Sequence, residues 1–282
     1  MLKRIASFIA LISLTVGMWA DEIPDSVFEA DPYFILMGEA DSAIIKHDWP
    51  TAVLRLNDAL AVKPQHPSNA LLYNNLATVY GYMGQDSLSL DTFNKGLEIA
   101  PNMLTLILGR GRALLANGKV SEAFVDFNRA VELDSVSVDA RYYRGMVALY
   151  GGDLVRAERD FEVMNRVAPK LADTAIALST LYAMTHREKE AIPLLKGLIA
   201  HDPAAEFYAT LAECYLATDD LSNASETIGA GLERYPQNAE LYYCRAWLNR
   251  GRYLLDDAQA DAKTAIKLGA NPRKVNKLFK EK

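Results

Sequence analysis

Side chains with chemical reactivity are sparse in this 282-residue sequence, and their spacing does not form a catalytic set. The four histidines stand far apart and include no HExxH pair; they are His47, His66, His186 and His201. A metal site requires several ligands that converge in a fixed geometry, so this spacing predicts none. No GxSxG motif occurs, and the glycines between residues 109 and 118 lie in a helical pattern without a preceding strand. We therefore expect no catalytic residue, no metal and no cofactor.

Two carboxylate pairs, Asp219-Asp220 and Asp256-Asp257, could suggest acid–base chemistry. A glycosidase needs two carboxylates that face one cleft, and the sequence places no such pair. Each pair instead precedes a predicted helix, where acidic side chains cap the free N–H groups and oppose the helix dipole. We interpret both pairs as helix starts.

The two cysteines, Cys214 and Cys244, lie on the first helices of neighbouring predicted units. An oxidising compartment would permit a disulfide between them. The alternative is a pair of small buried thiols, because the Cβ separation that a disulfide requires is narrow.

An Asp-Ser/Thr-apolar tripeptide occurs at several points and resembles the acceptor for O-glycosylation in some Gram-negative bacteria. The candidate acceptors expected to be exposed are Ser26, Ser87 and Ser135. The alternative is that Asp and Ser occur together because both favour turns and helix N-caps.

Most of the reactive side chains named above lie within a sequence pattern that repeats along most of the chain. From Ala70 apolar residues recur at helical spacing, Gly84 marks a turn, a second helical stripe follows, and Pro101 closes the unit. The next units begin 34 residues on at Leu104 and another 34 on at Val138. Small residues recur at fixed positions in every unit, which predicts pairs of helices that approach closely.

This pattern resembles the tetratricopeptide repeat, a helix–turn–helix unit of 34 residues. The resemblance implies an all-α fold, a right-handed α-solenoid of about seven units with a C-terminal capping helix. The predicted units are residues 33–66, 70–103, 104–137, 138–171, 172–204, 205–238 and 239–272, and the capping helix is 273–282. A capping helix is expected because a solenoid must cover its last apolar face. His186 replaces the turn glycine of the fifth unit, and Gly251 comes early in the last, which leaves that turn's geometry open.

Residues 1–20 have the layout of a secretory signal peptide, with Lys3 and Arg4 followed by an apolar run to Ala20. The run is short for a membrane span, although an uncleaved anchor is the alternative. Cleavage is expected after Ala20, or otherwise after Gly17, and leaves an acidic segment, residues 21–32. Removal of the two positive charges takes the net charge from -6 to -8. The expected location is the periplasm or the outside of the cell, with no integral membrane span after cleavage.

The composition fits this interpretation. Hydrophobic residues make up 50% and charged residues 23%, which are the values of a folded globular chain. The acidic balance makes nucleic acid an improbable partner, because phosphate contacts need a basic surface.

In the family that the repeats resemble, the first helix of each unit lines an inner surface and carries the binding residues. Carried onto this sequence, that surface includes Tyr82, Arg112, Tyr142, Met146, Tyr150, Tyr243 and Trp247, with acidic residues Glu206, Glu213 and Glu240 beside them. Any of these side chains could instead pack between neighbouring units. Tyr142, Met146 and Tyr150 share one helix face because they are four residues apart.

The resemblance implies a non-catalytic adaptor of the bacterial cell envelope that binds a protein or peptide segment in its groove. The carboxylates on the predicted surface favour a partner of basic or mixed apolar and basic character. A glycan-binding or glycan-processing helical protein is the alternative, motivated by the tyrosines and acidic pairs, and a structural spacer is a third hypothesis.

Overall fold

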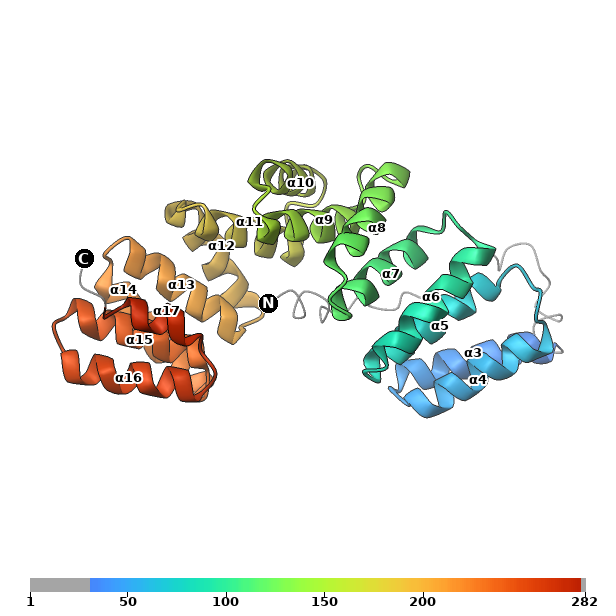
Figure 1. Cartoon of the computed structure of the whole chain (residues 1–282), viewed down its shortest axis with the longest axis horizontal. Coiled ribbons are helices and arrows are strands. Elements are labelled where there is room, and N and C mark those ends of the chain that lie inside the picture. The colour runs from blue at the N-terminus through green and yellow to red at the C-terminus, as the bar shows by residue number, and fades with distance from the viewer. Residues whose placement is uncertain (1–30, 280–282) are drawn as a thin grey trace. The chain divides into compact units, whose positions relative to one another are not determined.

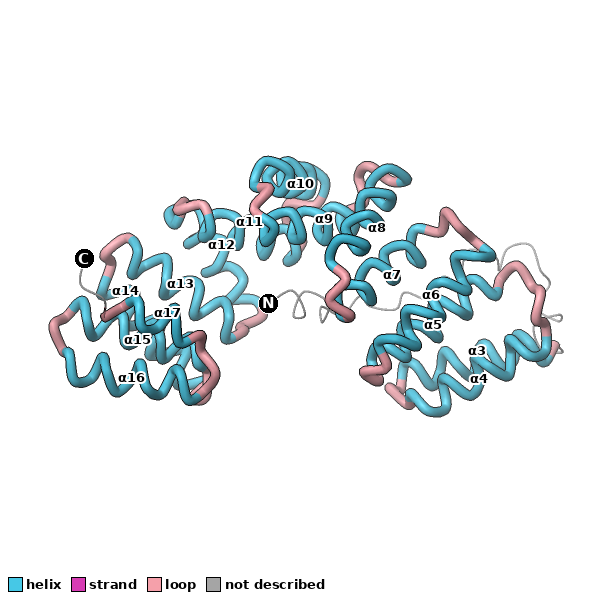
Figure 2. The backbone as a smooth tube through the Cα atoms, viewed as in Figure 1, coloured by secondary structure: helices cyan, strands magenta, loops and turns pink. Residues whose placement is uncertain are grey.

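The structure is a computed structural model that describes residues 31–279, and over this range it contains helices and turns without a strand (Figures 1 and 2). The predicted signal peptide, nearly all of the acidic segment 21–32, and Ser26 lie outside the described residues. The chain divides into two compact units between Asp153 and Leu154. Each unit is described by itself below.

Unit 1 stacks helices in consecutive pairs. Its helices are α3 (Pro32–Ile45), α4 (Trp49–Val62), α5 (Asn69–Tyr82), α6 (Asp86–Ile99), α7 (Leu104–Ala116), α8 (Val120–Leu133) and α9 (Val138–Gly151). The two helices of each pair pack on each other, and the second helix also packs on the first helix of the next pair. The resulting apolar cores are built around buried side chains such as Tyr33, Leu56 and Leu106.

Unit 2 is built in the same way. Its helices are α10 (Leu154–Val167), α11 (Ala172–Met184), α12 (Glu188–His201), α13 (Ala205–Ala217), α14 (Leu221–Arg234), α15 (Ala239–Gly251), α16 (Leu255–Lys267) and α17 (Pro272–Lys277). A single apolar cluster runs from α12 to the end of α17 and includes Leu195, Phe207 and Ile228. The all-α fold of stacked helix pairs is therefore confirmed, and the division between the units falls inside the predicted unit 138–171.

Aspartate caps begin helices α3 and α4. The Asp31 carboxylate accepts a hydrogen bond from the Tyr33 N–H (3.0 Å) with Pro32 in the first turn of α3. The Asp48 carboxylate accepts from the Thr51 N–H (3.3 Å) at the start of α4. Asp220 caps α14 in the same way, which supports the structural interpretation of that acidic pair.

Small residues allow the close helix contacts that the repeats predict. A Cβ placed on Gly111 would lie 2.5 Å from the Phe127 ring, and one placed on Gly96 would lie 2.7 Å from Leu106. Such distances are far inside van der Waals contact, so a side chain at either glycine would push the helices apart. Ala40 and Ala77 stand at the same position as Gly111 in their units and are fully buried.

The turns inside the helix pairs close with one residue of positive φ. This residue is Gly84 (71°) or Gly118 (76°) in unit 1, where glycine adopts the left-handed region without steric cost. Other turns use a side-chain residue instead: His47 (57°), His186 (58°), Asp219 (59°) and Tyr253 (63°).

The turn of the last pair is displaced from its early glycine. Helix α15 runs through Gly251, and Tyr253 takes the positive φ two residues later. The Leu254 N–H then donates to the Asn249 carbonyl (2.9 Å), which is the same bond that Gln85 makes to Tyr80 after Gly84 (2.9 Å). The turn keeps its hydrogen bonds, so the glycine is not required for its closure.

An ion pair also joins the two helices of several pairs. In α7–α8 the Arg110 guanidinium donates to both carboxylate oxygens of Asp126 (2.8 and 2.7 Å). In α15–α16 Arg245 makes the same two bonds to Asp261 (2.9 and 2.6 Å). In α3–α4 the polarity is reversed, since Glu39 on the first helix pairs with Arg55 on the second (2.8 Å).

Candidate partner-binding face

Unit 2 gathers acidic and aromatic side chains on its first helices. We define the receptor face as Glu206 and Glu213 of α13 with Glu240, Tyr243 and Trp247 of α15. Glu206 and Glu213 are two helical turns apart on α13, and the Tyr243 and Trp247 rings lie with centroids 6.2 Å apart on α15. The face therefore places carboxylates beside the half-buried Trp247 ring, which lies next to the buried Tyr243.

A lysine from the C-terminal helix already contacts this face. The Lys274 Nζ donates to Glu213 Oε1 (2.7 Å) and to Glu240 Oε2 (2.8 Å). It also lies 4.2 Å from the centroid of the Tyr243 ring. Two carboxylates from different helices and one aromatic ring thus hold a single ammonium by charge pairing and a cation–π contact.

The electrostatics of the cluster follow from this contact. Burial by itself lowers the pKa of Lys274, but Glu213 and Glu240 outweigh burial and raise that pKa above its ordinary value. The pKa of Tyr243 is raised to about 12, chiefly because its hydroxyl is buried. Lys274 is therefore charged and Tyr243 neutral at physiological pH.

The sequence analysis predicted a capping helix over 273–282 but did not identify the contact that Lys274 makes. A signal was present, because Lys274 follows Glu240 by 34 residues, one repeat length. Helix α17 therefore continues the register of the first helices and places its lysine level with Glu240. The predicted residue Tyr243 is buried below that contact, and Trp247 is half-buried beside it.

In unit 1 the predicted residues Tyr82 and Arg112 have different surroundings. Tyr82 is exposed and stacks on Trp49, with centroids 5.1 Å apart and ring planes within 14°. Sequence reasoning used Trp49 only as part of a helix start and missed this pair. Arg112 is partly buried, and its guanidinium carbon lies 5.7 Å from the Tyr143 ring.

The prediction for α9 needs correction. Tyr142 and Met146 are buried, with 4% and 3% of their surfaces exposed, so neither offers an open contact surface in this structure. Within unit 1, the Tyr142 and Tyr143 rings pack edge to face, and the Tyr143 ring stacks on Phe127. Tyr150, the third residue of that predicted stripe, is partly buried.

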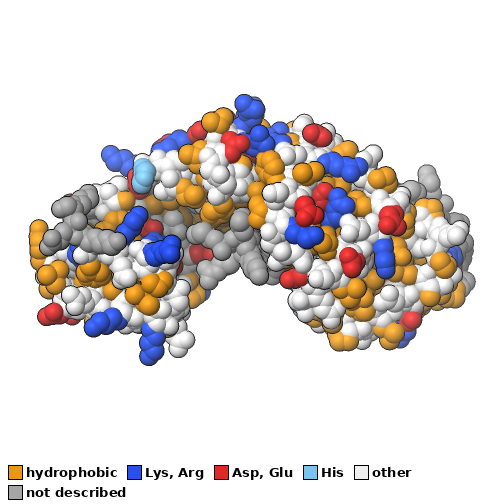
Figure 3. Space-filling model, viewed as in Figure 1, with side chains coloured by type: hydrophobic (Ala, Val, Ile, Leu, Met, Phe, Trp, Pro, Cys, Tyr) orange, Lys and Arg blue, Asp and Glu red, His pale blue; other side chains and the backbone are white. Residues whose placement is uncertain are grey.

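Charge on the surface is mixed rather than concentrated. Figure 3 shows Lys and Arg side chains and Asp and Glu side chains interspersed with apolar ones over the face turned to the viewer. Recognition on such a surface depends on particular pairs of charges more than on a broad field. The Glu213–Glu240–Lys274 contact is one such pairing.

Comparison with known families supports the pattern of helix pairs. Models described as "Tetratricopeptide repeat" match residues 70–103, 108–164 and 186–248. The chain contains tetratricopeptide repeats. Each of the three matched segments falls on paired helices described above.

A curated relative and two solved structures are similar to this chain. The chain is 27% identical over 217 residues to DnaJ homolog subfamily C member 3 of Gallus gallus. The aligned segment covers 70% of this chain and 42% of that relative. The chain thus spans less than half the length of that relative. A crystal structure of a tetratricopeptide repeat protein from Parabacteroides merdae aligns with a TM-score of 0.68 at 22% identity, over 88% of this chain and 97% of that one. YrrB, described as a TPR protein with an unusual peptide-binding site, aligns with a TM-score of 0.52 at 20% identity, over 67% and 98%.

The cysteines of the sixth and seventh repeats are free thiols. Cys214 and Cys244 are both buried, and the disulfide that the sequence left open is not formed in the structure. The Cys244 Sγ instead lies 3.6 Å from the Ala209 carbonyl oxygen, to which it donates. Burial raises the pKa of Cys214 to about 12 and that of Cys244 well above its ordinary value. Both are therefore small buried residues of the repeat core.

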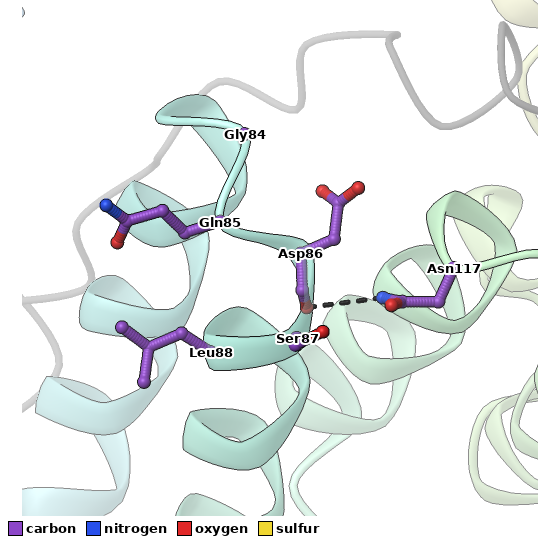
Figure 4. Close-up of a pocket in the computed structure, with 6 residues that line it drawn as sticks. All are labelled: Gly84, Gln85, Asp86, Ser87, Leu88 and Asn117. Atoms are coloured by element: carbon purple, nitrogen blue, oxygen red, sulfur yellow. Dashed lines mark hydrogen bonds between the residues drawn. The ribbon is translucent and has the colours of Figure 1, made fainter.

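Ser87 and Ser135 are exposed, so the structure leaves both open to modification. Ser87 lies beside an open hollow at the start of α6, where the Asn117 side-chain amide donates to the Asp86 carbonyl (3.2 Å) (Figure 4). Gln85 and Leu88 extend to the side away from Asn117 (Figure 4). Asp134 accepts from the Val136 N–H (3.0 Å), so this Asp-Ser pair also forms a turn.

The histidines stay separate in the fold. His47 and His186 occupy turns of positive φ, and within residues 31–279 no three His, Cys, Asp or Glu side chains are grouped as metal ligands. No helix in that range is long and apolar enough to cross a membrane.

Proposed function

We propose that this chain is a non-catalytic adaptor that binds a protein segment on the first helices of its repeats. The observation that carries the proposal is the receptor face, because carboxylates and aromatic rings from α13 and α15 meet on one surface. Aromatic anchors beside charged groups are typical of the centre of a protein interface. YrrB, with its unusual peptide-binding site, gives the proposal a precedent in a chain of similar fold.

The proposed setting is the bacterial cell envelope. It is supported by the signal-like layout of residues 1–20, with Lys3 and Arg4 ahead of an apolar run. The partner proposed for this setting is a segment of basic or mixed apolar and basic character, because the receptor face is acidic. Binding to such a segment should weaken as salt is raised, since its ion pairs are partly exposed.

Site-specific photo-crosslinking in the native cell tests the function directly. A photoreactive phenylalanine analogue replaces Trp247 on the receptor face, and the matched control replaces Glu226, an exposed residue on the second helix α14. We expect a discrete protein adduct at position 247 and none of that mass at position 226. Equal adducts at both positions, or none at 247, would contradict binding at this face. Fractionation and intact mass of the same protein test the envelope location and the cleavage after Ala20.

A further inference from the structure

Helix α17 is held to unit 2 by two separate sets of contacts. Val275 and Leu278 are buried in the apolar cluster at the end of the repeats, and Phe279 packs beside them. Lys274, in the same short helix, contacts Glu213 and Glu240. The apolar anchors cover the end of the core, and the lysine contact links α17 to α13 and α15 by charge.

The contact that Lys274 makes is the contact that a basic partner would make. Its ammonium meets one carboxylate from α13, one from α15 and the ring of Tyr243. All three groups belong to the receptor face. The chain therefore presents its own lysine to the surface on which the proposed partner binds.

The lysine contact can be exchanged. The side chains of Lys274, Glu213 and Glu240 keep 38%, 35% and 40% of their surface exposed, so water and a partner reach all three. Partly exposed ion pairs contribute little net stability, because the ammonium recovers hydration when it leaves. Replacement of one ammonium by another is thus nearly balanced, and contacts beside it, such as those to Trp247, decide the outcome.

We propose that Lys274 is an internal competitor at the receptor face, and that a protein segment binds by placing its own lysine between Glu213 and Glu240. This inference rests on the proposed function and names the residue of the partner that the face recognises. The receptor face is therefore partly masked in the free protein. Loss of Lys274 raises the affinity for a lysine-bearing segment.

Peptide binding to the full chain tests the competition. The probe is a labelled peptide with the sequence of residues 271–279, and its matched control has glutamine in place of the lysine that corresponds to Lys274. The proteins are the unsubstituted chain, K274Q, and K277Q as a control at an exposed lysine of the same helix. By fluorescence anisotropy we expect K274Q to bind the lysine peptide about tenfold more tightly than the other two chains. The glutamine peptide should show no such gain.

A triple variant, K274Q/E213Q/E240Q, identifies the groups responsible and should lose the gain. Circular dichroism of each variant verifies that the helices remain folded. Equal affinity of K274Q and the unsubstituted chain for the lysine peptide overturns the inference. Equal binding of the two peptides by K274Q, or no binding by it, overturns it as well. If the crosslink at position 247 persists in any of these cases, the adaptor function stands and only the competitor role of Lys274 fails.

Discussion

Helix pairs α3–α4 and α7–α8 place an ion pair at the same position with opposite polarity. Glu39 faces Arg55 in the first pair, and Arg110 faces Asp126 in the other. The side chains of Glu39 and Arg55 remain 48% and 36% exposed, whereas that of Asp126 is only 4% exposed and accepts two bonds from Arg110. The short aspartate on the second helix is enclosed, while the reversed pair stays in water. The same spacing therefore produces two interactions of very different strength.

The largest effect is expected from Asp126→Ala. Removing the carboxylate leaves the partly buried Arg110 guanidinium without its main partner, which should lower the free energy of unfolding by about 3 kcal/mol. Urea unfolding followed by circular dichroism measures the loss. A loss below about 1 kcal/mol would mean that this enclosed pair behaves like the exposed pair of α3–α4.

A double variant of the same pair provides the control. Helices α5 and α6 carry Leu76 and Thr92 at the equivalent positions. The variant R110L/D126T therefore places the residue types of that pair between α7 and α8. Because an uncharged pair of similar volume avoids the desolvation of two charges, the double variant should recover most of the loss. Failure to recover would show that neighbouring residues depend on the charges.

The next effect concerns Asp41 in α3, which has no counterpart in the α7–α8 pair. Burial raises the pKa of Asp41 from 3.8 to about 6. Its raised pKa favours the protonated form in the folded state, so stability is greatest at low pH and decreases as pH rises from about 4 to 6. Asp41→Asn should increase the free energy of unfolding at pH 7 by about 1–2 kcal/mol and remove this dependence. Urea unfolding between about pH 4 and 7 measures it. D91N, at an exposed aspartate of α6, controls for loss of charge.

The turns of the two pairs offer a smaller, reciprocal test. Gly118 closes α7–α8 with φ 76°, and His47 closes α3–α4 with φ 57°. Gly118→Ala should lower the free energy of unfolding by about 1 kcal/mol, because Cβ disfavours the left-handed region. His47→Gly should raise it by about 0.5 kcal/mol, since relief of that strain exceeds the added chain entropy. Opposite signs in thermal unfolding would support the comparison, and equal signs would contradict it.

The smallest effect is expected from Glu39→Ala. The Glu39–Arg55 pair is exposed at both ends, so its removal should change the free energy of unfolding by less than about 0.5 kcal/mol. The change should disappear in about 1 M salt, where charges are screened within a few ångströms. A loss close to that of Asp126→Ala would show that burial does not distinguish the two pairs.

The sequence predicted the features that depend on near neighbours. The turn at Gly84 and the close contacts at small residues such as Gly111 are local, because each needs only a residue type at a fixed repeat position. The small residues at these positions leave little freedom in how the paired helices pack. The helix pairs could therefore be predicted from the repeated pattern together with the family that it resembles.

The features that joined distant residues were harder to predict. Lys274 meets Glu213 across 61 residues, and this contact depends on where α17 docks after the last repeat. The aromatic residues of the first helices were ambiguous for another reason. Tyr142 and Tyr82 stand at the fifth and thirteenth positions of their units, and both were predicted on the same helix face. Tyr142 is buried against Tyr143, whereas Tyr82 is exposed and stacks on Trp49. Periodicity identifies the helix face, and packing with neighbours decides the exposure.

The two buried thiols of unit 2 allow the opening of its repeats to be measured by cysteine labelling. Thiol reagents attack the thiolate of an accessible cysteine, and Cys214 and Cys244 are neither ionised nor accessible in the folded repeats. A reagent can therefore label Cys214 or Cys244 only after α13 or α15 separates from its neighbours. Since these are the only cysteines in the sequence, the labelling rate of the unmodified protein records the opening of the sixth and seventh repeats, with no signal from the rest of the chain.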